Sequence, residues 1–190
     1  MTIPDIEPPK EVCLTIVSSV RKLARRKSFL TPLLRQAQRS ELSLGASHPV
    51  YVLSVPNASS DETLAQAELV RWRYLIFRAE QAIACAEAVR SEQSGKEVWA
   101  FLRIGEGPVV QATANAMHDA EQLPEVRDGS YQMRLLLVPS RSVAALWLKD
   151  LQGNHTLLLP LQLQPGQHKL SHPCTEAQFF ASLTKGDIRP

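Results

Sequence analysis

The chain has 190 residues, of which 44% are hydrophobic and 21% charged, a globular composition that excludes disordered and fibrous classes. Its formal net charge of +2 is too small to imply nucleic acid or an anionic membrane as an obligatory partner. There is no apolar run of membrane-spanning length and no secretory signal pattern, so we expect no membrane segment and a cytoplasmic location. Three scattered cysteines, Cys13, Cys85 and Cys174, indicate reduced thiols rather than a disulfide framework.

We expect a single domain over residues 1–190, because no Gly, Ser or Pro tract is long enough to link two. Residues 1–9 hold three prolines before any periodic pattern and predict an extended arm. From Lys10, apolar residues recur every three or four positions through Ala24, which predicts an amphipathic helix. Thr31-Pro32 then predicts a second, short helix that stops at Gly45, so the chain opens with a helical pair.

The segment from Ser59 to Gly95 predicts one long, mostly buried central helix. It begins with Ser-Ser-Asp-Glu, which can cap a helix, and ends with Ser-Gly, which can stop one. Between these signals lie roughly thirty residues without Gly or Pro. Residues at 65, 69, 72, 76, 79, 83 and 86 form a near-heptad apolar seam, and the helix is expected to be longer than one sheet.

Strand patterns precede this segment and dominate the chain after it. Residues 49–55 are β-branched and aromatic, and 98–104 with 109–114 read as a hairpin around Gly105-Glu-Gly-Pro108. Three more apolar runs are expected as strands, at 131–138, 143–149 and 156–163, with short helices at 115–123 and 175–183. Strands that cluster in this way favour an α+β fold with a mainly antiparallel sheet of five to six strands.

The densest group of potential metal ligands is His168, His172 and Cys174 near the C-terminus. A closed zinc site needs four ligands, and no second cluster supplies the remainder, so we predict a polar loop and no metal. The chain has no nucleophile elbow, phosphate loop or dinucleotide fingerprint. We therefore expect no cofactor and favour a protein that is not an enzyme.

Arg21, Arg25 and Arg26 belong to the clearest charge asymmetry in the chain and are candidates for contact with an anion. The alternative is that they complement the C-terminal end of a helix dipole. The absence of interleaved aromatic residues disfavours nucleic acid.

Two functions remain open at this point. The first is a non-catalytic intracellular protein that acts through protein binding or self-association, with a homodimer formed through the long helix around Leu69, Trp72 and Ile76. The second is a small-molecule-binding domain or enzyme with a pocket between the sheet and the long helix. The candidate residues for that pocket or interface are Trp72, Tyr74, Trp99 and Trp147.

Overall fold

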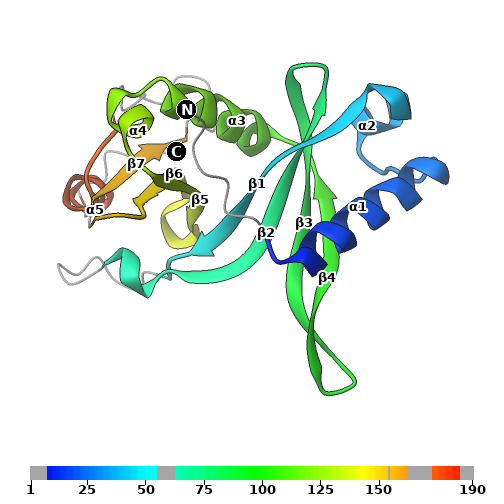
Figure 1. The fold of residues 1–190 in the computed structure, drawn as a ribbon, viewed down its shortest axis with the longest axis horizontal. Coiled ribbons are helices and arrows are strands. Elements are labelled where there is room, and N and C mark those ends of the chain that lie inside the picture. Colours follow the sequence, from blue (N-terminus) through cyan, green and yellow to red (C-terminus); the bar gives the residue numbers. More distant parts are fainter. Residues whose placement is uncertain (1–7, 55–62, 154, 162–172, 185–190) are drawn as a thin grey trace.

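The computed structural model describes residues 8–54, 63–153, 155–161 and 173–184, and in this part of the chain one mixed sheet organises the fold (Figure 1). Its seven strands lie in the order β4-β3-β2-β1-β5-β6-β7. Their bounds are β1 (Leu42–Val52), β2 (Glu68–Arg78), β3 (Gln81–Gln93), β4 (Lys96–Gly105), β5 (Tyr131–Val138), β6 (Val143–Asp150) and β7 (Thr156–Pro160). The α-helices are α1 (Lys10–Arg25), α2 (Pro32–Gln36), α3 (Pro108–Glu121), α4 (Pro124–Asp128) and α5 (Glu176–Thr184).

The sheet consists of two antiparallel ribbons joined in the middle by one parallel pair. β1 to β4 form an antiparallel meander, and β5 to β7 form another. β1 and β5 run parallel, with Val50 opposite Leu135. Parallel strands need a long connection, and β1 and β5 are connected by the strands β2 to β4 followed by α3 and α4.

Helices cover both faces of the sheet. α1 packs on β3 and β4, where Val12, Ile16 and Val20 meet Trp72 and neighbouring apolar residues. α3 and α4 cover the opposite face, as the alternation along β2 and β6 shows: Leu75, Leu146 and Leu148 turn towards them. α5 packs at the β7 end on the same face as α1. On that face, α1 and α5 therefore lie at opposite ends of the sheet (Figure 1).

The predicted long central helix is wrong. Its residues form the short 3-10 helix η2 (Leu64–Gln66) and the β2–β3 hairpin, in which Trp72 pairs with Ala88. The apolar residues of β2 also fit a period of two, which places alternate side chains on opposite faces. The hairpin turns at Ala79, which has a positive φ of 52°. Glycine or asparagine is usual at such a position, and because an alanine is there instead, the sequence gives no indication of the turn.

Three further element predictions are corrected. α2 ends at Gln36, and the residues from Leu42 through Gly45 belong to β1. Ser94 and Gly95, expected to stop the helix, have φ angles of 53° and 74° and form the β3–β4 turn. Residues 109–114 are helical, because Pro108 is at the first position of α3 rather than in a hairpin turn. The expected five to six strands are seven, and the sheet is mainly antiparallel, as predicted, but mixed, because β1 pairs with β5 in parallel.

The α+β class, the first helix, the last three strands and the C-terminal helix agree with expectation. The expected arm lies largely in residues 1–7, outside the described residues. None of the helices within the described ranges combines the length and apolar character needed to cross a membrane.

The surface on which self-association was predicted lies inside the chain. Trp72 is 5% exposed and Ile76 is 1% exposed, both beneath α1, and Leu69 is half-buried. Trp72 and Ile76 are core residues of one chain, so these two side chains cannot also form the dimer contact. A homodimer remains a prediction without a surface assigned to it.

Candidate functional site

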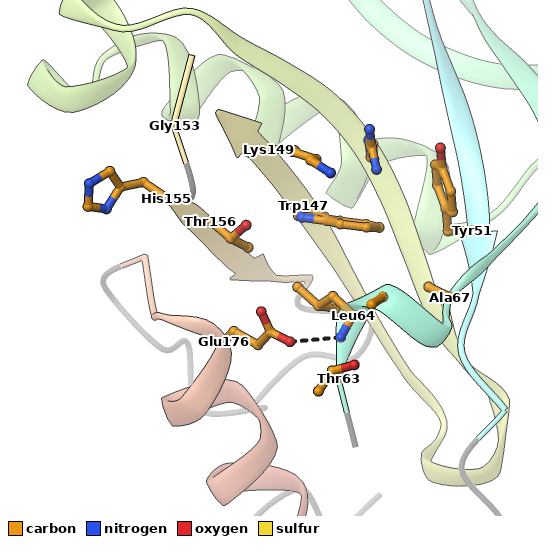
Figure 2. Close-up of a pocket in the computed structure, with 12 residues that line it drawn as sticks. Tyr51, Thr63, Leu64, Ala67, Trp147, Lys149, Gly153, His155, Thr156 and Glu176 are labelled. Atoms are coloured by element: carbon orange, nitrogen blue, oxygen red, sulfur yellow. Dashed lines mark hydrogen bonds between the residues drawn. The ribbon is translucent and has the colours of Figure 1, made fainter. Parts of the chain in front are cut away.

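A cavity of about 500 Å³ lies beside α5, on the face of the sheet that α1 and α5 share. Its floor is formed by side chains of β1, β5, β6 and β7 (Figure 2). The walls are the η2 segment, the start of α5 and the β6–β7 turn. The lining residues are Tyr51, Thr63, Leu64, Ala65, Ala67, Arg134, Trp147, Lys149, Gly153, His155, Thr156 and Glu176.

Arg134 is the central cation of this cavity. It lies opposite Trp147 in the β5–β6 register, and its guanidinium carbon is 4.6 Å from the centroid of that indole. The same carbon lies 4.8 Å from the ring centroid of Tyr51, which comes from β1. The two rings meet edge to face with centroids 5.2 Å apart. The guanidinium therefore contacts two aromatic rings at once, and its charge interacts with both ring quadrupoles.

No carboxylate neutralises Arg134 among the described residues. Its Nε donates to Gln132 Oε1 at 2.6 Å, and no ion pair is formed. Burial lowers the pKa of the Arg134 guanidinium, and the nearby Tyr51 opposes this shift. Lys149 and His155 lie on the exposed rim of the cavity. A cation with two aromatic contacts and one neutral acceptor has hydrogen-bonding capacity left for an anion.

The acidic residue of the cavity is already engaged. Glu176 Oε1 accepts a hydrogen bond of 2.7 Å from the backbone N–H of Leu64, which links the two walls (Figure 2). This bond joins residues 112 positions apart and fixes η2 against α5. Trp147 Nε1 is buried and has no hydrogen-bond partner within the described part of the chain. The cavity thus offers a cation, Arg134, and a hydrogen-bond donor, Trp147 Nε1, while the Glu176 carboxylate binds the backbone of Leu64.

A second group of charged residues lies on the other face of the sheet. Glu87 is fully buried in β3 and accepts from Arg73 Nη2 at 2.6 Å and from Arg103 Nε at 2.8 Å. Arg71 Nε lies 3.4 Å from the same carboxylate. Burial alone would raise the pKa of the Glu87 carboxyl, but Arg73, Arg103 and Arg71 together hold it below its usual value. One carboxylate therefore organises three arginines from the two strands that flank it, β2 and β4.

His48 completes this buried group. It pairs with Arg73 in the β1–β2 register, so both side chains point to one face of the sheet. The imidazole is fully buried, and neither ring nitrogen has a hydrogen-bond partner within the described residues. Burial and the charge of Arg73 lower the pKa of His48 from 6.5 to about 3, against the opposing influence of Glu87. His48 is therefore neutral at physiological pH.

The residues predicted as a pocket or interface separate into two places. Trp72, Tyr74 and Trp99 pack beneath or beside α1 in its hydrophobic core. Trp147 lines the cavity beside α5. The aromatic residues are thus not brought together, and the long helix expected as the pocket wall does not exist.

The other sequence candidates are likewise dispersed. Cys174 is buried, and its Sγ donates to the Leu158 carbonyl oxygen at 3.4 Å, while His168 and His172 lie outside the described residues. No group of three potential ligands for a metal ion occurs within the described ranges. Arg21, Arg25 and Arg26 are exposed on and just after the last turns of α1.

Sequence reasoning missed Arg134, Tyr51 and the Glu87 group. A signal was present in both places: Arg134 is the one charged residue of the run 131–138, and Glu87 is the one charged residue of the run 82–89. A charged residue alone in an apolar strand must find a partner, because an unpaired buried charge is costly. Comparisons with protein-family models, curated proteins and solved structures found no match for this chain.

Proposed function

We propose that this α+β protein is a binding protein, not an enzyme, and that it takes a small anionic ligand with an apolar or aromatic body in the cavity beside α5. The observation that carries the proposal is the Arg134 guanidinium, which contacts Tyr51 and Trp147 and has no carboxylate partner in the described structure. The ligand would supply the missing negative charge.

The charges of the cavity favour an anion over a neutral or cationic ligand. Arg134 and Lys149 contribute two positive charges and Glu176 one negative charge, so the lining keeps an excess of one positive charge. The carboxylate of Glu176 is held in the wall by the backbone N–H of Leu64. A guanidinium can bind a carboxylate or phosphate through two parallel hydrogen bonds, a geometry that a lysine ammonium does not offer. Partial burial strengthens such a bond, because less water competes for the donor.

The size and the remaining surface of the cavity favour a small molecule. A volume of about 500 Å³ is within the range of about 300–1,000 Å³ typical of small-molecule sites. Tyr51, Trp147 and Leu64 provide apolar surface next to the cation. A ligand that combines a planar anion with a ring or short hydrocarbon would use both kinds of contact.

Isothermal titration calorimetry with a series matched in size tests this proposal. Benzoate, benzyl alcohol and benzylammonium share one ring and differ in charge, and we expect benzoate to bind best, with a Kd of about 1 mM for so small a probe. Arg134→Gln should weaken benzoate binding about tenfold or more, because it removes a charge-assisted bond. Arg141→Gln is the matched control, since Arg141 is also half-buried but lies outside the cavity.

Two results would contradict the proposal. One is equal binding of the alcohol and the carboxylate, which would mean that charge does not determine affinity. The other is full benzoate affinity in Arg134→Gln, which would place the anion elsewhere.

A further inference from the structure

A second region of the molecule concentrates positive charge far more than the net charge suggests. Residues 12–40 contain seven basic residues and no Asp or Glu. Because the whole chain carries +2, the remaining residues together carry −5. We call the seven side chains the basic end: Arg21, Lys22, Arg25, Arg26, Lys27, Arg35 and Arg39. All seven are exposed, and none forms an ion pair within the described residues.

The basic end is a structured surface. The last turns of α1 and the whole of α2 lie together at the end of the molecule away from β7 (Figure 1). Lys27, Arg35 and Arg39 line one hollow of about 450 Å³, whose apolar side is formed by Phe29 and Leu34. The backbone N–H groups of Leu33 and Leu34 donate to the Glu106 carboxylate at 3.4 Å and 3.2 Å, which ties α2 to the start of α3.

Exposed leucines gather at the same place. Among the described residues, five large hydrophobic side chains are exposed, and three of these lie in residues 12–40. Leu30 is 91% exposed and Leu33 is 47% exposed, and both lie between Lys27 and Arg35 in the chain. On α1, Leu14, Arg21 and Arg25 share the face that points away from the buried Val12 and Ile16. Exposed cations and exposed leucines therefore occur together in residues 12–40.

From this arrangement we infer that the basic end binds the surface of an anionic lipid membrane. Lys and Arg side chains would contact headgroup phosphates, and Leu30 and Leu33 would insert between the headgroups. Nucleic acid is a poorer partner, because the basic end has no exposed aromatic residue for stacking and protruding leucines find nothing to contact on a phosphate backbone. Helix-dipole compensation explains only part of the surface, since Lys27 and Arg39 lie outside both α1 and α2, although Arg35 is in the last turn of α2.

The net charge conceals the basic end. The value of +2 is the sum of +7 in residues 12–40 and −5 in the rest of the chain. It therefore does not describe how strongly the basic end attracts an anion. The basic end uses different residues from the Arg134 cavity, and each binding activity can therefore fail without the other.

Co-sedimentation with large vesicles tests the inference on the full chain. We expect binding to vesicles of phosphatidylcholine and phosphatidylserine in equal amounts, none to phosphatidylcholine alone, and release as salt is raised. Each surface cation contributes about 1 kcal/mol, which is about fivefold, so the double variant Arg25→Gln, Arg35→Gln should bind about 25-fold more weakly. The double variant Lys96→Gln, Arg127→Gln removes two exposed cations elsewhere and should change binding less than about twofold.

Leucine variants separate insertion from charge attraction. Leu30→Ser should weaken vesicle binding about fivefold, while Leu151→Ser, which alters an exposed leucine outside the basic end, should not. All of these positions are exposed, so unfolding midpoints should match that of the wild type. Equal losses in the two charge variants, or no loss in Leu30→Ser, would overturn the inference. Binding to a single-stranded oligonucleotide or to polyglutamate without binding to the vesicles would also overturn it.

Discussion

Arg73 is buried and Arg134 is half-buried in this fold, but only Arg73 has a carboxylate partner among the described residues. Arg73 donates two hydrogen bonds to Glu87, which is buried beside it and also holds Arg103. Arg134 donates to a neutral amide and contacts two aromatic rings. The first arrangement pairs a buried arginine with a buried carboxylate inside the sheet and belongs to the architecture, although Arg73 Nη1 has no hydrogen-bond partner within the described residues. The second has no carboxylate partner among the described residues and borders a cavity, and for this reason we propose that it binds a ligand.

The largest effect expected from this difference is the loss of the Glu87 charge. Glu87→Gln removes the anion that three arginines share, and a broken buried pair leaves uncompensated charge at a cost of about 3–5 kcal/mol. Urea denaturation should show a free energy of unfolding lower by that amount. A loss below about 1 kcal/mol would mean that the group is hydrated and contributes little to the stability of the fold.

The second prediction concerns pH. The pKa of His48 is about 3 in the folded chain and near 6.5 when unfolded, so between these values the unfolded state binds a proton that the folded state does not. Stability should therefore be full above about pH 6.5 and should fall by up to about 1.4 kcal/mol per pH unit as pH decreases towards about 3.

The variant His48→Phe isolates this contribution. It keeps an aromatic ring of similar shape, and it should flatten the pH dependence between about 6.5 and about 4.5. Below that window the lowered pKa of Glu87 adds a loss in the same direction, because its stabilisation disappears as the carboxylate is protonated. An unchanged slope in His48→Phe would assign the dependence to other groups.

The third prediction is a smaller change at Arg134. Arg134→Met keeps most of the side-chain volume and leaves no charge without a partner, since Gln132 loses only one donor. The free energy of unfolding should change by less than about 1.5 kcal/mol in either direction. A loss as large as that of Glu87→Gln would make Arg134 a structural residue and weaken the case for a ligand.

The smallest effect is expected at the surface. Arg90 and Glu97 form an ion pair of 3.6 Å between exposed side chains. Glu97→Gln should cost no more than about 1 kcal/mol, because exposed pairs gain little over their interactions with water. Measured beside Glu87→Gln, this variant separates the effect of burial from that of charge pairing alone.

The parts of the fold that could be predicted are those in which local pattern and tertiary environment agree. β5 and β6 have continuous apolar runs bounded by turn residues, and α1 has one apolar stripe and one polar face. The β2–β3 hairpin was missed, because the alanines of β3 favour a helix and the turn at Ala79 carries no glycine or asparagine. β2 and β3 are each paired with a strand on both sides, and this pairing outweighs the helix preference of the alanines.

The candidate site could be predicted only in part. Trp147 was selected as an aromatic residue, but Tyr51 and Arg134 become its neighbours through the pairing of β1 with β5 and of β5 with β6. Tyr51 is far from the other two residues in the chain, and no spacing in the sequence encodes its contact with them. The β1–β5 pair is parallel, and the sequence pattern, which predicts a mainly antiparallel sheet, does not indicate which two strands would pair in this way.

Arg134 has no carboxylate partner among the described residues, whereas Arg73 and Arg103 are both paired with Glu87. The most direct test of this difference is urea denaturation with and without benzoate at about ten times its Kd, a concentration that should raise the stability of a binding protein by about 1.4 kcal/mol. We expect this increase in the wild type and in Arg103→Met, and no increase in Arg134→Met. An increase that persists in Arg134→Met, or one that disappears in Arg103→Met, would show that the anion does not bind at Arg134.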